Sequence, residues 1–399
     1  MSKPQNPAAS ERRIDLDWVR IGAFGLLIFY HVGMLYVSWG FHIKSAHRLA
    51  WLEPVMLLVN PWRLPLLFLV SGVATRFMLG KYDRLSLLRT RSARLLIPLT
   101  FGVLVIVPPQ AYVQVVESVG YPSGFIDFYL HHYLAGAVQF CPGPCIMLPN
   151  WNHLWFLPYL WVYTAVLIGA LAVWPLFGRR LGAALAVLLS GPWLLILPCL
   201  LFVSWRLFLY PAFPATYALL GDWYNHADFA TAFLIGFLLA KEEGIWSELE
   251  RLRWLSVGLA AGSFAVFILL RAGVTGTLVS LPTLKIIVGS AYGFYQWLVM
   301  AAVLGQARHL VTADGPVRRY LTDAMFPYYI AHQTALIMIA HALQGNGLSA
   351  GQEACIVFGG TVAACVVSYE IVRRIAWLRP LFGLRMRPSP SLKAVQRPA

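Results

Sequence analysis

Two side chains capable of chemistry share one apolar stretch near the start of the chain: Arg20 and His31, with ten residues between them. In a helix, eleven steps separate them by roughly 16 Å along the axis and return them to nearly the same face. A fixed cation near one membrane surface and a titratable base at depth predict a reaction path across the membrane. Two plainer interpretations stay open: Arg20 extends to the lipid headgroups, and His31 hydrogen-bonds a neighbouring helix.

Arg63 and His332 are further polar residues within apolar stretches. Arg63 lies about halfway along its stretch, where a guanidinium needs a partner or a water-filled cavity. We predict that Arg63 contacts substrate, against the alternative of a structural pair with Glu53 or a loop carbonyl. For His332 the alternatives are a place in the same cavity and a polar contact in the core. Glu370 and Arg373, near the end of the last apolar stretch, are expected to pair with each other.

The apolar stretches that carry these residues predict membrane-spanning helices. The 399-residue chain is 59% hydrophobic and only 12% charged, whereas soluble proteins carry about 25% charged residues. A spanning helix needs about 20 mostly apolar residues. The sequence therefore predicts an all-α fold, a polytopic membrane helical bundle of about ten transmembrane helices. They are expected at 18–39, 50–76, 95–116, 153–174, 181–204, 228–241, 254–273, 284–306, 321–342 and 351–374.

The placement of Lys and Arg predicts which ends of these helices face the cytoplasm. With the N-terminus inside, 24 of the 31 Lys and Arg residues fall in inside segments and five outside, while Arg20 and Arg63 lie within helices. Cytoplasmic loops carry such an excess, so we expect both termini to be cytoplasmic. The predicted parts are a cytoplasmic segment at 1–17, a membrane domain at 18–375 and a basic cytoplasmic tail at 376–399. The basic residues form no stripe with interleaved aromatics, which argues against nucleic acid as a partner.

The five cysteines form no metal-ligand pattern, so we predict no metal site. Cys141 and Cys145, in a loop expected outside, either stay unpaired or close a small disulfide. Two unpaired thiols are the plainer interpretation.

Five motifs, met in order along the chain, resemble the acyltransferase-3 family of integral membrane acyltransferases. The first joins Asp17-Trp18-Val19-Arg20 to Tyr30-His31 and is similar to the family's Arg and His separated by ten residues. The others are Phe68-Leu69-Val70-Ser71-Gly72, the basic run Arg89 to Pro98, His153-Leu154-Trp155-Phe156-Leu157, and Phe326-Pro327-Tyr328-Tyr329-Ile330-Ala331-His332. The resemblance runs from about residue 12 to 375. Phe41 to Ala46 and Trp62 to Pro65 resemble the glucans biosynthesis protein C group, associated with succinylation of periplasmic glucans.

The resemblance implies a bacterial inner-membrane enzyme that moves an acyl group from cytosolic acyl-CoA to a carbohydrate hydroxyl on the periplasmic side. Succinyl-CoA or acetyl-CoA would be a co-substrate, with no tightly bound cofactor. His31 would be the general base or a transient acyl carrier, and Arg20 would anchor the CoA phosphates or hold His31 in register. The nucleotide end of CoA would bind Arg89, Arg91 and Arg94. The substrate would contact Arg63, His153, Trp155 and His332.

A second class of function stays open, a transporter or exporter of a glycan or an acyl compound. Intramembrane His and Arg also serve proton-coupled transport. The sequence shows no inverted repeat that would favour it. A membrane sensor or scaffold without chemistry would leave Arg20 and His31 unexplained.

Overall fold

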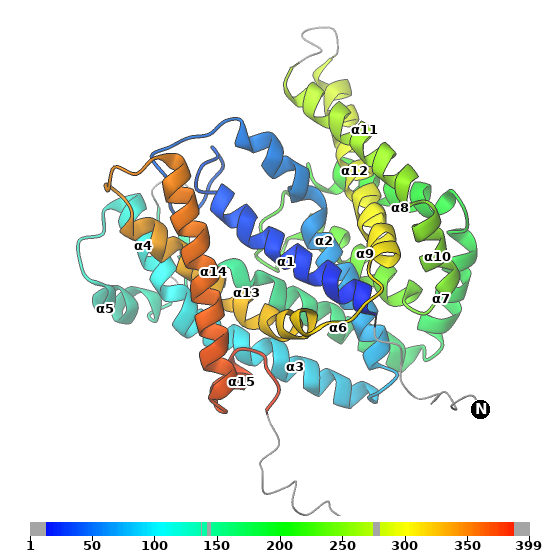
Figure 1. Cartoon of the computed structure of the whole chain (residues 1–399), viewed down its shortest axis with the longest axis horizontal. Helices are drawn as coiled ribbons and strands as arrows, with labels where there is room; N and C mark the ends of the chain where they lie inside the picture. Colours follow the sequence, from blue (N-terminus) through cyan, green and yellow to red (C-terminus); the bar gives the residue numbers. More distant parts are fainter. Residues whose placement is uncertain (1–12, 137, 142–144, 274–279, 387–399) are drawn as a thin grey trace, which may run out of the picture.

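The computed structural model describes residues 13–136, 138–141, 145–273 and 280–386. Most of the described residues are helical, and the two short strands named below are the strands among them (Figure 1). The α-helices are α1 Ile14–Gly33, α2 Leu52–Met78, α3 Arg84–Phe101, α4 Val107–Val119, α5 Phe125–Phe128, α6 Phe156–Val173, α7 Phe177–Leu188, α8 Trp193–Ser204, α9 Trp223–Leu239, α10 Glu243–Arg251, α11 Arg253–Arg271, α12 Leu281–Leu310, α13 Pro316–Ala342, α14 Ala350–Arg374 and α15 Leu378–Leu381. The π-helical segments Gly102–Ile106, Tyr129–Tyr133 and Trp205–Leu209 and the 3-10 turn Asn152–Trp155 continue or precede them.

The ten predicted segments all coincide with helices, which confirms an all-α membrane bundle. Within the described residues, seven helices are long and apolar enough to cross a membrane, or eight if a pair bent by 105° is one span. That pair, Arg180–Leu188 and Trp193–Leu209, corresponds to the predicted segment 181–204. The two predicted helices outside this set are α9, which has only 17 residues, and α13, whose apolar stretch contains the polar His332 and Gln333.

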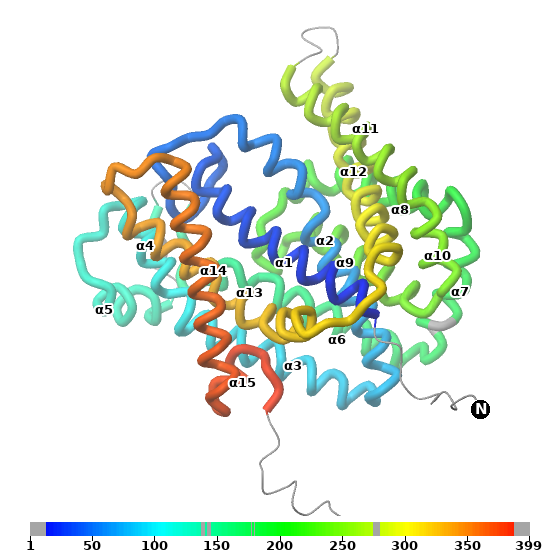
Figure 2. The backbone as a smooth tube through the Cα atoms, in the orientation of Figure 1, coloured from blue at the N-terminus to red at the C-terminus, as the bar shows by residue number. Residues whose placement is uncertain are grey.

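Helix α1 occupies a central place in the bundle and carries both Arg20 and His31. It packs against α2, α12, α13 and α14, and Figure 2 shows it crossing the middle of the view between α14 and α12. Its first turn is fixed by Arg318 of α13, which is 1% exposed and forms ion pairs with Asp17 and with Asp314. A buried guanidinium is costly without carboxylate partners, so these pairs tie the start of α1 to α13.

Helices α2 and α9 approach each other closely at two glycines. A Cβ added to Gly72 would lie 2.0 Å from the backbone oxygen of Phe233, and one added to Gly236 would lie 2.0 Å from that of Leu69. No other residue type fits such a contact without moving a helix. Gly72 follows Ser71, so this packing fixes the position of the Ser-Gly motif.

Helix α3 begins at a clear N-terminal cap. The Asp83 carboxylate accepts hydrogen bonds from the backbone N–H groups of Leu85 and Ser86. These bonds satisfy amide groups that the first helical turn leaves unpaired. The cap sets the register of the helix that carries Arg91 and Arg94.

The two small predictions on side-chain pairing had different outcomes. Cys141 and Cys145 form a disulfide, so the interpretation as two unpaired thiols is wrong. The bridge joins the ends of the antiparallel strands β1 Val138–Phe140 and β2 Ile146–Leu148, which hold the thiols close together. The pairing of Glu370 with Arg373 is confirmed, with 2.9 Å between the Glu370 carboxylate and Arg373 Nε.

The two ends of the described chain lie at the same end of the bundle, because Arg13 and Arg385 line one cavity. Helix α14 ends at Arg374, next to the boundary predicted between residues 375 and 376. Beyond it the chain continues through α15, which contacts α3, and the ring of Phe382 lies 5.4 Å from that of Phe101.

Candidate functional site

Three histidines from three separate helical units form a cluster inside the bundle. His31 lies on α1, His332 on α13 and His153 in the turn that leads into α6. Nδ1 of His31 is 3.1 Å from Nε2 of His332, and the rings of His153 and His332 are 5.1 Å apart. His332 is completely buried and His153 is 5% exposed. Three residues predicted at the site are thus brought together.

Hydrogen bonds assign the protons of the neutral rings. His332 Nδ1 lies 2.7 Å from the backbone oxygen of Tyr329, and because a carbonyl can only accept, Nδ1 must donate. Nε2 of neutral His332 then accepts, so His31 Nδ1 donates to it. The lone pair of neutral His31 is consequently on Nε2, and no described residue hydrogen-bonds that atom. An imidazole held through one nitrogen with a free lone pair on the other suits a general base or a nucleophile.

A chain of side-chain amides extends from this cluster and was not predicted from the sequence. Gln110 Nε2 lies 3.3 Å from His153 Nδ1, and Gln110 Oε1 accepts a 3.0 Å hydrogen bond from Gln333. Gln333 in turn lies 2.9 Å from His42 Nε2, and His42 Nδ1 is 2.6 Å from Gln114 Oε1. The available signal was three glutamines within apolar stretches, Gln110, Gln114 and Gln333, since amides in such surroundings need partners.

His42 belongs to the loop between α1 and α2 and is neutral near pH 7. Burial lowers the pKa of His42 below its ordinary value of 6.5, and the hydrogen bond to Gln114 offsets only part of this. The neutral ring donates through Nδ1 and accepts through Nε2, which matches its two glutamine partners. A chain of hydrogen-bonded side chains therefore links His153 of the cluster to His42 and Gln114.

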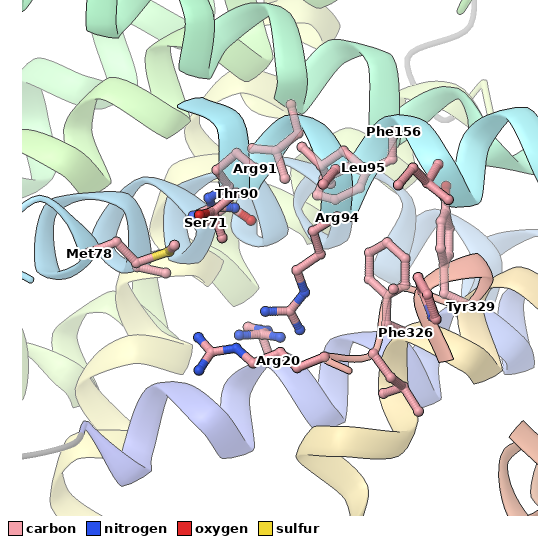
Figure 3. A pocket seen from close by; sticks show the side chains of 18 of the residues that line it. Arg20, Ser71, Met78, Thr90, Arg91, Arg94, Leu95, Phe156, Phe326 and Tyr329 are labelled. Carbon is pink, nitrogen blue, oxygen red and sulfur yellow. The ribbon is translucent and has the colours of Figure 1, made fainter. Parts of the chain in front are cut away.

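A second feature is a cavity of about 430 Å³ near the start of α1, shown in Figure 3. Ligand pockets are typically about 300–1,000 Å³ in volume. Arg20 of α1 and Arg91 and Arg94 of α3 line it, and in Figure 3 Arg20 and Arg94 face the same space. It shares Arg20, Arg94 and Arg385 with an adjoining cavity of about 1320 Å³. Three predicted arginines therefore gather at one ligand-sized space.

One layer of aromatic rings separates this arginine-lined cavity from the histidine cluster. Phe24, Phe156 and Tyr329 line the cavity, and the rings of Phe24 and Tyr329 meet edge to face at 5.7 Å. Tyr329 also contacts the histidines, because its hydroxyl donates to the backbone oxygen of His153 at 2.5 Å while its own carbonyl accepts from His332. On α1, Phe24 lies between the two features in sequence. The cavity and the cluster are thus neighbours along one axis.

Arg63 contacts the ring of Tyr30, the residue before His31 of the histidine cluster. Its guanidinium sits 3.4 Å from the centre of the Tyr30 ring, and Nη1 donates to Asn60 Oδ1 at 2.7 Å. Arg63 is 5% exposed, and within the described chain its Nε has no hydrogen-bond partner. The alternative of a pair with Glu53 is wrong, since the Glu53 carboxylate accepts from Ser38 instead. Arg63 retains an unused donor inside the bundle.

Two predicted site residues do not join either feature. Arg89 is exposed and is not among the lining residues of the two cavities. Trp155 packs against Tyr217 and Phe229, with ring centres 4.6 Å and 5.4 Å away. Their roles in binding stay predictions. In the part of the chain that the structure describes, no three His, Cys, Asp or Glu side chains group so as to hold a metal ion.

Comparison with known proteins adds a family to this geometry. A family model described as an acyltransferase domain matches residues 13–372. The chain belongs to the acyltransferase-3 family. The resemblance in the five motifs is confirmed by a match over nearly the whole chain, and an acyltransferase domain of many apolar helices makes this a multi-pass membrane protein.

Curated relatives are more distant and cover less of the chain. Glucans biosynthesis protein C from Escherichia coli K12 and from Escherichia coli O1:K1 / APEC are each 24% identical over 171 residues. The match covers 41% of this chain and 40% of each relative, so the chain spans about two fifths of the length of the curated relatives it matches. No solved structure matches the chain.

Proposed function

We propose that this protein is an inner-membrane O-acyltransferase that moves an acyl group from cytosolic acyl-CoA to a carbohydrate hydroxyl on the periplasmic side. The observation that carries the proposal is the arrangement along α1. Arg20 lines a ligand-sized cavity with Arg91 and Arg94, and His31 lies eleven residues further on with a free lone pair. The family match and the glucan-related names of the relatives support the reaction and the acceptor class.

The arginine-lined cavity suits the nucleotide end of CoA. Guanidinium groups bind phosphate oxygens through paired, charge-assisted hydrogen bonds. Arg91 is held for this role by a 2.9 Å hydrogen bond from its Nη2 to Thr75 Oγ1, which leaves its other donors for a ligand. With the phosphates there, the thin pantetheine arm would extend past Phe24 and Tyr329 toward His31. The excess of Lys and Arg at this end supports a cytoplasmic location.

His31 would act as the general base. As the acceptor oxygen attacks the thioester carbonyl, its hydroxyl proton moves to His31 Nε2. The new C–O bond forms, the C–S bond breaks, and the proton then passes from Nε2 to the CoA sulfur. Protonated His31 still donates through Nδ1 to His332, and this hydrogen bond strengthens when the donor is charged. His332 would thus stabilise the transition state more than the resting state.

Arg63 would serve the acyl group or the tetrahedral intermediate. Its guanidinium is buried beside Tyr30, the residue before His31, and it has a donor without a partner. Such a preorganised cation suits either the developing oxyanion or the terminal carboxylate of a succinyl group.

The test uses membranes that contain the protein, with succinyl-CoA or acetyl-CoA as the acyl donor and a pool of periplasmic glycans as acceptor. Thiol release and glycan mass are measured together. His31→Gln should lower turnover at least about 100-fold, as expected for removal of a general base, while the protein accumulates normally. His341→Gln is the matched control, because His341 lies on α13, is partly exposed and pairs with Glu117 of α4. Undiminished turnover in His31→Gln would remove His31 from the mechanism, and a transporter would release no thiol.

A further inference from the structure

The chain beyond the family domain folds back over the arginine-lined cavity. The family match ends at residue 372, and α14 ends at Arg374. Residues 375–386, here called the C-terminal strap, then turn through α15 and reach the cavity. Four consecutive strap residues, Gly383 to Met386, line the cavity together with Pro380. A segment outside the family domain therefore forms part of the wall of the candidate acyl-donor site.

Packing and hydrogen bonds hold the strap in this position. Phe382 is 7% exposed, and its ring lies 5.4 Å from that of Phe101 on α3. Arg379 ties the strap together, because its Nη1 donates to the backbone oxygen of Arg373 at 2.9 Å and its Nε to that of Arg385 at 2.8 Å. A buried aromatic anchor and two side-chain-to-backbone hydrogen bonds indicate a built element.

Gly383 fixes where the strap turns over the cavity. Its φ is +69°, and an added Cβ would lie 2.4 Å from the ring of Phe326. Both the left-handed backbone and the contact with the ring favour glycine at this position. Phe326 itself lines the cavity, as Figure 3 shows. The strap is therefore seated directly on the wall of the cavity.

Arg385 adds a cation from the strap to those of α1 and α3. It lines both cavities, as do Arg20 and Arg94, and its charge is close enough to interact with that of Arg94. Asp323 is the carboxylate near Arg94, and it lines the adjoining cavity. The described lining of the 430 Å³ cavity contains no carboxylate. Like charges gathered in this way repel one another, and an anionic ligand relieves that repulsion.

We propose that the strap is an acyl-donor-binding element in which Arg385 binds the phosphate groups of CoA together with Arg94. This inference rests on the proposed function for the identity of the ligand. Arg385 is exposed and lines the cavity, so its guanidinium is accessible to phosphate oxygens, while the neighbouring Leu384 adds an apolar side chain to the lining. Arg379 is a positioning residue, since its hydrogen bond to the Arg385 carbonyl sets the place of Arg385.

The test compares two acyl donors that share the thioester but differ in phosphates, S-acetyl-CoA and S-acetyl-pantetheine. Loss of a hydrogen-bonded charge pair predicts that Arg385→Ala raises KM for acetyl-CoA about 10- to 100-fold. KM for S-acetyl-pantetheine should stay unchanged, and Arg385→Lys should recover part of the affinity for acetyl-CoA. Direct binding of CoA to the detergent-solubilised protein, measured by calorimetry, should weaken in parallel.

Arg374→Ala is the matched control. It removes the same charge one residue before the strap, from a side chain that is 67% exposed, paired with Glu370 and outside both cavity linings. An unchanged KM for acetyl-CoA in Arg385→Ala, or an equal rise for both acyl donors, would overturn the role of Arg385. Equal effects of Arg374→Ala would overturn it as well. If the unaltered protein neither binds CoA nor releases thiol from acetyl-CoA, the proposed function itself fails.

Discussion

Replacing His332 by Asn or Gln separates its hydrogen bond with His31 from its hydrogen bond with the Tyr329 carbonyl. The side-chain amide of Gln reaches the position of imidazole Nε2, whereas that of Asn reaches the position of Nδ1. His332→Gln therefore keeps an acceptor for His31 Nδ1 but loses the donor to the Tyr329 carbonyl. His332→Asn keeps that donor and loses the acceptor. We expect the Gln variant to be the more active and the Asn variant the more stable.

The magnitude follows from the charge that His31 acquires in the transition state. A neutral hydrogen bond contributes about 0.5–1.5 kcal/mol, and one to a charged group about 1.5–3 kcal/mol. Loss of the charged form at the 3.1 Å contact between His31 and His332 should lower kcat about 10- to 100-fold in His332→Asn. For His332→Gln we expect less than about 10-fold, with stability lowered by about 1–3 kcal/mol because the Tyr329 carbonyl loses its buried partner.

The assay is thiol release from acetyl-CoA by protein in lipid nanodiscs, with thermal unfolding followed in parallel. His341→Asn and His341→Gln are the controls, because His341 lies on the same helix and contacts Glu117 away from the cluster. Adding His332→Asn to His31→Gln should cause little further loss, since the two side chains act as a unit. The same rank order of the two His332 variants in activity and in stability would refute the role of His332 as the hydrogen-bond acceptor for protonated His31.

Two further predictions concern packing and pH. Gly72→Ala should lower stability by about 1–3 kcal/mol, seen as a lower Tm, because its Cβ would overlap the backbone of α9, whereas the exposed Gly22→Ala meets no atom within 4 Å and should not. A Gly72 variant with an unchanged Tm would contradict the close contact. Burial lowers the pKa of Lys44 to about 8, against about 10.4 in an unfolded chain. Between these values the unfolded state binds more protons, so the Lys44 contribution to stability rises with pH. Lys44→Met should flatten the Tm profile between pH 8 and 10, and a profile equally steep in the variant would refute the assignment.

The residues of the site were predictable because their chemistry conflicts with their surroundings. Arg20 and His31 are visible in the sequence as costly groups in an apolar helix, and the helical repeat places them on one face. His332 was visible for the same reason. Their meeting was not predictable, since the contact between His31 and His332 joins residues 301 apart in the sequence and depends on how α1 packs against α13. Nothing in local spacing encodes that packing.

Other features were missed because hydropathy and composition average over the signal. The 105° break before α8 coincides with Gly191-Pro192, a turn-forming pair that a hydropathy window ignores. The strap lies in a segment whose basic composition predicted a tail. A single aromatic, Phe382, and the left-handed Gly383 seat it on the domain, and their effect depends on the tertiary positions of Phe101 and Phe326.

The most direct test of acyl transfer across the bilayer resolves the two sides of a vesicle. The protein is reconstituted with its C-terminal end facing outward, checked by access to a C-terminal tag, and a pool of periplasmic glycans is sealed inside. Acetyl-CoA or succinyl-CoA, neither of which crosses the bilayer, is added outside. We predict free CoA thiol outside and acylated glycan inside, both lost in His31→Gln. Acylated glycan that forms only when glycans are supplied on the same side as acyl-CoA would contradict a path from Arg20 to His31.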